Sequence, residues 1–293
     1  MRITRNNIYH QFLPGIEPCV SISSGDSLTI ETLDAAGGRF LEGFVYTRPN
    51  PATGPVYVNG AIPGDTLEVE IRDIKLIGKG FLNVPDSGTN SRYEVKVGTL
   101  PDGNFRVLNM GASYNDKIFR SKPMIGVIGT AVSPDAQGGW FSTETGDHGG
   151  NMDNNAVTAG VKVYLPVFVE GALLGMGDIH GIMGDGEVFG QGVEICADVD
   201  ITVKIKKDMK INRPLVISDE IISTAASADT MEKAGDLAIS DMRFILEAYY
   251  NLKPADAALA IAFYGNLRVC QIVNPQKTMR MEIKKDMIDL FKN

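Results

Sequence analysis

The stretch VEICADVDITVKI, residues 193–205, carries the clearest structural pattern in the chain. Apolar residues occupy every second position from Val193 to Ile205, and the positions between them are mostly charged or polar. Successive side chains of a β-strand point to opposite faces of a sheet, so this period of two predicts a long strand with one buried face. The body of the protein is therefore expected to be built from β-sheet.

Shorter apolar or alternating runs predict further strands upstream of this stretch. They lie at residues 20–23, 28–33, 56–60, 67–74, 125–132, 162–169 and 173–178. Gly25-Asp26 supplies a turn between the first two runs, and Pro63-Gly64-Asp65 supplies one between the next two. The second pair reads as a hairpin-like unit.

The pattern changes after Arg213. Residues 229–250 place apolar side chains at spacings of three and four, which predicts an amphipathic helix with Ser227 or Asp229 as its N-cap. Pro254 is expected to begin a second helix that ends near Tyr264, and a strand is expected at 269–273.

Together these patterns predict one domain over residues 1–293, mostly β with some α. Its β-sandwich-like body covers about residues 1–210, and a smaller α/β C-terminal part covers about residues 211–293.

Composition excludes several classes of partner. The net charge of −8 disfavours nucleic acid, because phosphate binding requires a basic surface. No run approaches the roughly 20 apolar residues that span a bilayer. The three widely spaced cysteines are typical of free thiols in a reducing compartment. We therefore expect a cytoplasmic protein that binds neither nucleic acid nor membrane.

Two glycine-rich segments indicate the chemistry. They read ETGDHGGNMD at residues 144–153 and GDIHGIMGDGE at residues 177–187, and they contain two of the three histidines and six carboxylates. Divalent-metal sites in proteins are built from carboxylate oxygens and imidazole nitrogens, and glycines give the backbone the freedom to bring them together. Asp178 and His180, two positions apart at the end of an expected strand, should face the same side and share one ion.

Two alternatives accompany the metal hypothesis. Asp and Gly in loops often do no more than form turns, and a single histidine is often structural. Imidazole with carboxylate favours zinc, whereas an all-oxygen set such as Asp185 and Glu187 with nearby carbonyls favours calcium.

The chain resembles the acetamidase/formamidase family from His10 to about Lys285. Four blocks carry the resemblance: residues 18–35, residues 50–67, residues 148–153 followed by 165–167, and residues 177–188 followed by Glu194. The resemblance implies a β-rich fold, a bound divalent metal and a homodimer or higher homo-oligomer. It also implies hydrolysis of a short linear carboxamide to a carboxylate and ammonia. The family's GGNMD, GDxH and GDGE blocks map onto Gly149–Asp153, Asp178, His180, Asp185 and Glu187, and Asp34 of the first block also matches.

The sequence departs from the family pattern at three positions. Gly181 and Met183 stand where the family more often has Ala and Gln, and Phe189 stands where formamidases often have Cys. These changes leave the expected ligands intact and disfavour a cysteine-dependent mechanism.

The resulting hypothesis is an amidase that uses a metal-activated water. Asp178 and His180 are expected to hold the ion, zinc in preference to calcium. The further candidate ligands are His148, Asp153 and Asp34.

Three other groups complete this mechanism. Glu187 is expected to move the proton and Asn151 to orient the amide, while the backbone N–H groups of Gly149 and Gly150 stabilise the oxyanion.

Two other functions stay open on the sequence alone. In the first, carboxylates such as Glu187 and Asp34 act as base or nucleophile without an ion. In the second, the protein has the same fold but only binds a metal through its acidic loops, without catalysis.

Overall fold

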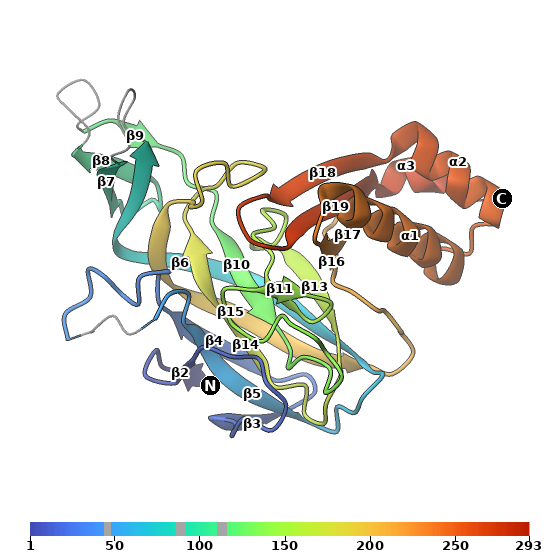
Figure 1. Ribbon diagram of the computed structural model, residues 1–293, viewed down its shortest axis with the longest axis horizontal. Helices are drawn as coiled ribbons and strands as arrows, with labels where there is room; N and C mark the ends of the chain where they lie inside the picture. The colour runs from blue at the N-terminus through green and yellow to red at the C-terminus, as the bar shows by residue number, and fades with distance from the viewer. Residues whose placement is uncertain (44–47, 86–91, 110–115, 293) are drawn as a thin grey trace.

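The computed structural model describes residues 1–43, 48–85, 92–109 and 116–292. It confirms a mostly β body with a smaller α/β C-terminal part, seen at the right of Figure 1. The body is a curled sheet in which most neighbouring strands run antiparallel.

The elements have the following bounds. The body contains β1 (Arg2–Ile3), β2 (Ile8–Tyr9), β3 (Val20–Ser23), β4 (Ser27–Thr32), β5 (Ala52–Asn59), β6 (Thr66–Pro85), β7 (Arg92–Thr99), β8 (Phe105–Asn109), β9 (Ile118–Phe119), β10 (Met124–Gly129), β11 (Thr145–Gly146), β12 (Gly149–Asn151), β13 (Val161–Pro166), β14 (Leu174–His180) and β15 (Glu194–Lys206). The C-terminal part contains β16 (Leu215–Ile217), β17 (Ile221–Ala228), α1 (Met231–Tyr249), α2 (Pro254–Tyr264), β18 (Asn266–Gln271), β19 (Lys277–Lys284) and α3 (Lys285–Asp289).

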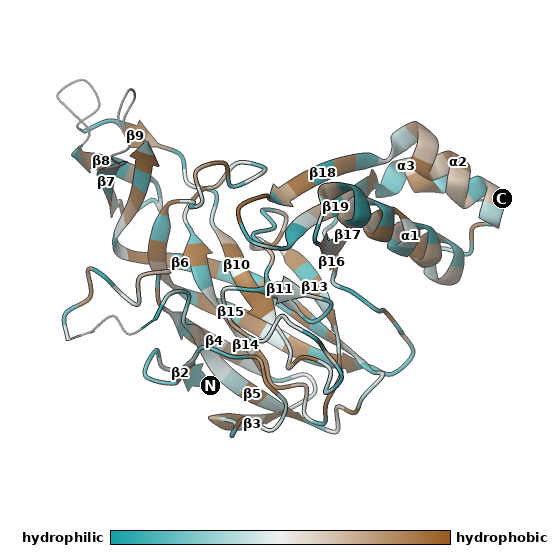
Figure 2. Cartoon of the chain, in the orientation of Figure 1, coloured by the Kyte–Doolittle hydropathy of each residue, from teal (hydrophilic) through white to brown (hydrophobic). Residues whose placement is uncertain are grey.

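Strand β15 is the long strand that the alternating stretch predicts. Its apolar positions are fully buried from Ile195 to Val203, while the charged or polar positions from Asp198 to Lys204 stay partly or fully exposed. β15 pairs antiparallel with β6 on one side and with β4 on the other. Figure 2 shows the alternation of apolar and polar residues along the body strands.

The turns between expected strand pairs do not close hairpins. β3 pairs in parallel with β5, whereas β4 pairs with β15. Likewise β5 pairs with β14, whereas β6 pairs with β13 and β15. Gly25 and Gly64 adopt positive φ, so both predicted turns are present. Turn residues fix only the local backbone, and the burial of apolar faces decides which strands pair.

The C-terminal part has its own apolar core, in which α1 packs on β17 and β19. Buried Ala238, Met242 and Ile245 of α1 meet Ile222 and Ile283 of the two strands. Tyr164 of β13 belongs to the same core, so the two parts share packing. The division near residue 210 stays a prediction.

The start of α1 differs from the prediction. Thr230 is the N-cap, because its Oγ1 accepts a hydrogen bond from the Lys233 N–H at 3.2 Å. Ser227 instead lies in β17, and Asp229 pairs with Lys233 through its side chain.

The β18–β19 hairpin reaches from the C-terminal part back to the body (Figure 1). A parallel bridge between Gly186 and Gln271 joins it to the loop that follows β14. Within the described residues no helix is both long and apolar enough to cross a membrane.

Candidate active site

Strand pairing brings three potential ligands together at one end of β14. His180 is the last residue of β14 and lies opposite Glu194, the first residue of β15. On its other side His180 lies opposite Met124 of β10. Asp178 lies two residues earlier in β14, next to Gly126 of β10. Asp178 and His180 share one strand, and the pairing of β14 with β15 adds Glu194.

Five ionisable side chains form the cluster. His180 Nε2 lies 3.2 Å from Glu194 Oε1 and 3.4 Å from Asp178 Oδ1, and His180 Nδ1 lies 3.9 Å from Asp153 Oδ1. Two sets can offer ligand atoms within 4.8 Å of one another: Asp153 with His180 and Glu187, and Asp178 with His180 and Glu194. All five residues are buried, with exposures of 1% to 6%.

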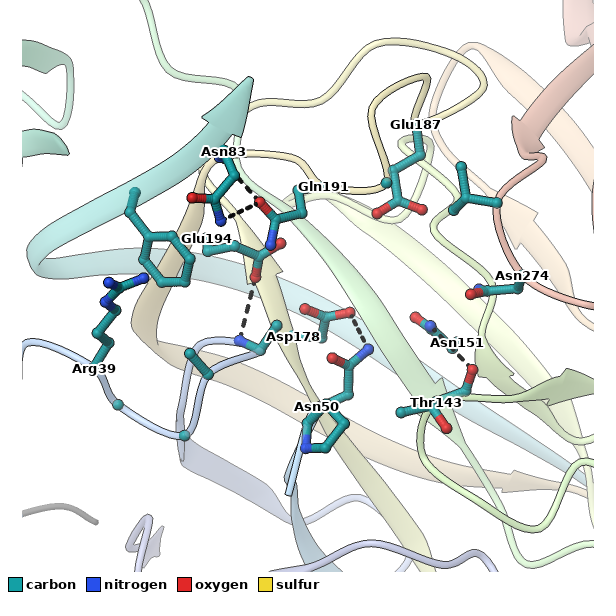
Figure 3. A pocket seen from close by; sticks show the side chains of 18 residues that line it. Arg39, Asn50, Asn83, Thr143, Asn151, Asp178, Glu187, Gln191, Glu194 and Asn274 are labelled. Carbon is teal, nitrogen blue, oxygen red and sulfur yellow. Dashed lines mark hydrogen bonds between the residues drawn. The ribbon is translucent and has the colours of Figure 1, made fainter. Parts of the chain in front are cut away.

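The cluster opens into a cavity of about 650 Å³. Asp178, Glu187 and Glu194 line this cavity, as Figure 3 shows. Asn50 Nδ2 donates to Asp178 Oδ2 at 2.9 Å, and the Ala35 N–H donates to Glu194 Oε2 at 3.2 Å. Asp178 and Glu194 are each therefore fixed through one carboxylate oxygen and present the other to His180.

Asn151 links two of the carboxylates. With its NH₂ group turned toward the cluster, Asn151 donates to Asp153 Oδ2 at 2.9 Å and to Asp178 Oδ2 at 3.2 Å. Its carbonyl oxygen then accepts from Asn274 Nδ2 at 3.1 Å. Asn151 also lines the cavity, so it can both bridge the two carboxylates and contact a ligand.

The backbone of the site is unusual. Asn50, Asp153, Asp178 and Glu187 all have positive φ, between +45° and +54°. Asn and Asp tolerate this left-handed region better than other side chains, but each such residue still costs of order 1 kcal/mol. The convergence of Asp178 and His180 thus depends on a left-handed residue inside β14, and not only on the regular i, i+2 spacing that the sequence suggested.

Gly126 leaves room for the cluster. A Cβ atom at this position would lie 2.6 Å from Asp153 Oδ1 and 3.0 Å from Asp178 Oδ2. Gly126 is in β10, where the strand MIGVIG is buried throughout. No side chain larger than hydrogen fits there without moving the carboxylates.

The electrostatics of the cluster are set by burial and by an excess of carboxylates. Burial alone would lower the pKa of His180, but Glu194 and Asp178 raise this pKa well above its ordinary value. Burial, followed by repulsion from Glu187 and Asp178, raises the pKa of Asp153 well above its ordinary value. Burial also raises the pKa of Glu187 to about 7 and that of Glu194 to about 8. Four carboxylates thus surround one imidazole.

These residues fit a divalent cation. Asp153 Oδ1, Asp178 Oδ1, His180 Nε2 and Glu187 Oε2 are buried, and none has a well-aligned hydrogen bond in the described part of the chain. Buried polar atoms are normally satisfied, and buried charges are normally paired or coordinate a metal. Carboxylate oxygens and an imidazole nitrogen form a donor set that suits zinc.

His148 is not part of this cluster, contrary to expectation. Gly149 lies opposite Gly129 of β10, and His180 lies opposite Met124. The positions next to the two histidines are therefore five residues apart along β10, or about 17 Å, although Asp153, at the end of the first segment, does reach the cluster. His148 packs its ring 5.2 Å from that of Phe12 and lines a separate cavity of about 360 Å³. We therefore set it aside as a ligand of the same ion.

Asp34 holds a loop and does not reach the cluster. Its carboxylate accepts backbone hydrogen bonds from Ala36, Gly38 and Arg39 at 2.9 to 3.4 Å. This loop supplies the Ala35 N–H that fixes Glu194. The role of Asp34 is therefore to shape the cavity wall, and neither of the two ligand sets among the described residues includes it.

Two further expectations change. Gly149 and Gly150 lie in β12 between β10 and β11 and are not among the residues that line the large cavity, so they are poorly placed as oxyanion donors. Asp185 points away from the cluster and pairs with Arg280 at 2.8 Å.

The sequence reasoning missed three contributors. Glu194 follows the fourth block, and the alternation of residues 193–205 puts it on the polar face of the strand, yet the fold buries it. Asn50 precedes the expected strand, and Asn274 lies about 90 residues beyond the second histidine segment. Only the fold places these two amides at the cavity.

Comparison with known proteins gives consistent matches. The model of the acetamidase/formamidase family matches residues 2–146 and 120–233. A formamidase from Methylophilus methylotrophus is 28% identical over 262 residues, which cover 69% of this chain and 64% of that relative. The match thus spans somewhat less than two thirds of the relative's length.

Solved structures match over nearly the whole chain. An acetamidase from Bacillus halodurans has a TM-score of 0.87 and 34% identity, with 100% of both chains covered. A predicted acetamidase/formamidase from Thermoanaerobacter tengcongensis has a TM-score of 0.86 and 33% identity, covering 99% of this chain and 97% of its own.

Proposed function

Because the chain belongs to the acetamidase/formamidase family, we propose that it cleaves the carbon–nitrogen bond of a short linear carboxamide, such as acetamide or formamide. The products are a carboxylate and ammonia. The observation that carries this proposal is the buried cluster around His180, which opens into a cavity lined by amide side chains.

The residues that would hold a divalent ion are His180 with Asp178 and Glu194, or His180 with Asp153 and Glu187. Such an ion, when bound, polarises a carbonyl and lowers the pKa of water to about 7. This is the chemistry that an amide needs, because its carbonyl is a weak electrophile and neutral water is a weak nucleophile.

Glu187 is the candidate for proton transfer in this proposal. It lines the cavity, and its Oε2 has no hydrogen-bond partner among the described residues. Since burial raises its pKa to about 7, the carboxylate can take a proton from water and return it to the leaving nitrogen near neutral pH. Asn50, Asn151 and Asn274 border the same cavity and offer N–H and carbonyl groups that orient an amide.

The proposal includes a cytoplasmic location and assembly of copies of the chain into a homodimer or larger oligomer. Support for assembly comes from α2, which is apolar along most of its length but buries only Ala257 and Ala260. Leu259 and Phe263 of α2 are 44% and 66% exposed. A molar mass equal to one chain in light scattering at micromolar concentration would contradict the assembly.

Ammonia release from formamide and acetamide tests the activity. We expect turnover by the purified protein, loss of turnover after chelation, and recovery with zinc. Turnover that is indifferent to chelation would instead favour the carboxylate-only amidase. Retained metal without turnover of any short amide would favour the metal-binding protein.

A paired substitution tests the role of Glu187. Glu187→Gln keeps the size of the side chain but removes the base, so kcat should fall by about 100-fold or more. Glu144→Gln is the matched control, since Glu144 lies in the other histidine segment and, within the described residues, its side chain accepts a hydrogen bond only from the Phe141 N–H. Equal activities of the two variants, both folded, would remove Glu187 from the mechanism.

A further inference from the structure

The C-terminal part forms one wall of the site, although the family match ends at residue 233. Val273 and Asn274, in the turn between β18 and β19, line the large cavity. Figure 3 places Asn274 on the same side of the cavity as Glu187 and Asn151. The cavity is thus incomplete without the β18–β19 hairpin.

The same hairpin holds the loop that carries Glu187. The Gly186 N–H donates to the Cys270 carbonyl oxygen at 3.1 Å, and the Ile272 N–H donates to the Gly186 carbonyl oxygen at 3.3 Å. These two bonds attach the residue immediately before Glu187 to the end of β18. The loop is therefore anchored by the backbone of a segment more than 80 residues away.

Arg280 adds a side-chain anchor next to this bridge. It is only 3% exposed, and its Nη2 donates to Asp185 Oδ1 at 2.8 Å. Its Nε donates to Glu282 Oε1 at 2.6 Å, and its Nη1 donates to the Val269 carbonyl oxygen at 3.2 Å. The planar guanidinium fork spans these three acceptors at once, which a single lysine ammonium cannot do.

Glu187 needs such support because of its backbone. Its φ is +46°, in a region that a glutamate rarely adopts and that persists only when the surrounding structure enforces it. Within the loop, the Glu187 N–H donates to the Gly184 carbonyl oxygen at 3.3 Å, and the Gly190 N–H donates to the Glu187 backbone carbonyl oxygen at 2.7 Å. Asp185 and Gly186, the two residues before it, carry the contacts to the hairpin.

We propose that Arg280 is a positioning residue for Glu187. Through its ion pair with Asp185, beside the backbone bridge between Gly186 and Gln271, it holds the 181–190 loop so that the Glu187 carboxylate faces the cluster. The effect on turnover rests on the proposed amidase function, whereas the effect on the loop does not.

Substitutions at both ends of the contact test the proposal. Arg280→Met removes the fork but keeps an unbranched side chain. Asp185→Asn weakens the same contact at the residue that is partly exposed. It therefore provides a second test if Arg280→Met fails to fold. Arg268→Met is the matched control, because Arg268 also pairs with Asp185, at 3.3 Å, but is 47% exposed. An exposed pair of this kind contributes little.

Two measurements are made on each variant. For Arg280→Met and Asp185→Asn we expect kcat for amide hydrolysis to fall about 10- to 100-fold, with KM changed less than about threefold, because misplacement of a reacting group by about 1 Å has this effect. Hydrogen exchange should become faster in the peptide that contains Gly186, while peptides from β10 and β15 keep their protection. For Arg280→Lys, both kcat and the exchange rate should lie between those of Arg280→Met and those of the unaltered protein. Arg268→Met should match the unaltered protein in both measurements.

The outcomes test the positioning role of Arg280 separately from the amidase function. Faster exchange at Gly186 together with reduced kcat supports the positioning role. Unchanged exchange, or faster exchange with unchanged kcat, overturns it, as does an equal effect of Arg268→Met. If the unaltered protein hydrolyses no amide, the amidase proposal fails, and hydrogen exchange still decides whether Arg280 orders the loop.

Discussion

The two histidine segments look alike in sequence and differ in the fold. Both are rich in glycine and aspartate, and both bury their histidine, with His148 2% and His180 1% exposed. Burial lowers the pKa of His148 to about 3, so this ring is neutral at physiological pH. Burial alone would do the same to His180, but Glu194 and Asp178 raise its pKa well above the ordinary value.

Part of the difference comes from residues outside the two segments. Glu194 reaches His180 because β15 starts opposite the end of β14. His148 instead meets the Phe12 ring and the edge of β10. Local sequence thus supplies a histidine next to glycine and aspartate, and the neighbouring strands decide whether it is a neutral packing group or part of a charged cluster.

Replacement of each histidine gives the largest contrast. His180→Gln removes the central donor of the cluster, and we expect kcat/KM for acetamide or formamide to fall about 10³-fold or more. His148→Gln should change kcat/KM less than about threefold per folded molecule. Ammonia release, with circular dichroism as the check on folding, makes the measurement. Comparable losses in both variants would mean that His148 also serves the reaction.

Gly126→Ala tests the room that the cluster needs. The added methyl group would contact Asp153 Oδ1 and Asp178 Oδ2, so we expect a loss of about 100-fold in kcat/KM and a weaker affinity for zinc. Titration of the metal-free protein with zinc provides the second readout, independent of turnover.

Gly138→Ala is the control for this substitution. No atom lies within 4 Å of a Cβ at Gly138, which lines the cavity beside His148. This variant should keep both zinc affinity and activity. A Gly126→Ala protein with normal zinc affinity would show that the carboxylates move aside freely and that the cluster is less constrained than its contacts suggest.

Much of the fold was predictable because strand and helix periods are local. The alternation of residues 193–205 matches β15, and the apolar spacing of residues 229–250 matches α1. The pairing of the strands was not predictable in the same way. Gly25 and Gly64 form turns as expected, but the strands on either side pair elsewhere because burial over the whole sheet decides the partners.

The candidate site was predictable only in part, for the same reason. Asp178 and His180 are close in sequence and close in space. Glu194 and Gly126 depend on pairing across β14, which no local period reveals. His148 and Asp34 carry suitable ligand groups, but the fold gives them partners of their own.

The pH dependence of the free energy of unfolding gives a smaller contrast between the two histidines. His148 has an ordinary pKa of 6.5 when the chain is unfolded and a pKa of about 3 when it is folded. Below pH 6.5, His148 is protonated in the unfolded chain but stays neutral in the folded chain. The free energy of unfolding therefore falls as the pH falls toward 3. Above pH 6.5 both states are neutral, and this contribution to stability is fully present.

His148→Leu should remove this part of the acid sensitivity. Between pH 7 and pH 5.5 the unaltered protein should lose about 1 kcal/mol of unfolding free energy relative to the variant, as measured by urea denaturation at each pH. Asp135 and Asp147, which line the same cavity, and Arg213, which pairs with Asp147, are present in both proteins, so the comparison isolates the imidazole of His148. A difference that does not change with pH would mean that a nearby carboxylate or solvent accommodates the His148 proton. The neutral, packed state of this histidine, and with it the contrast with His180, would then have to be abandoned.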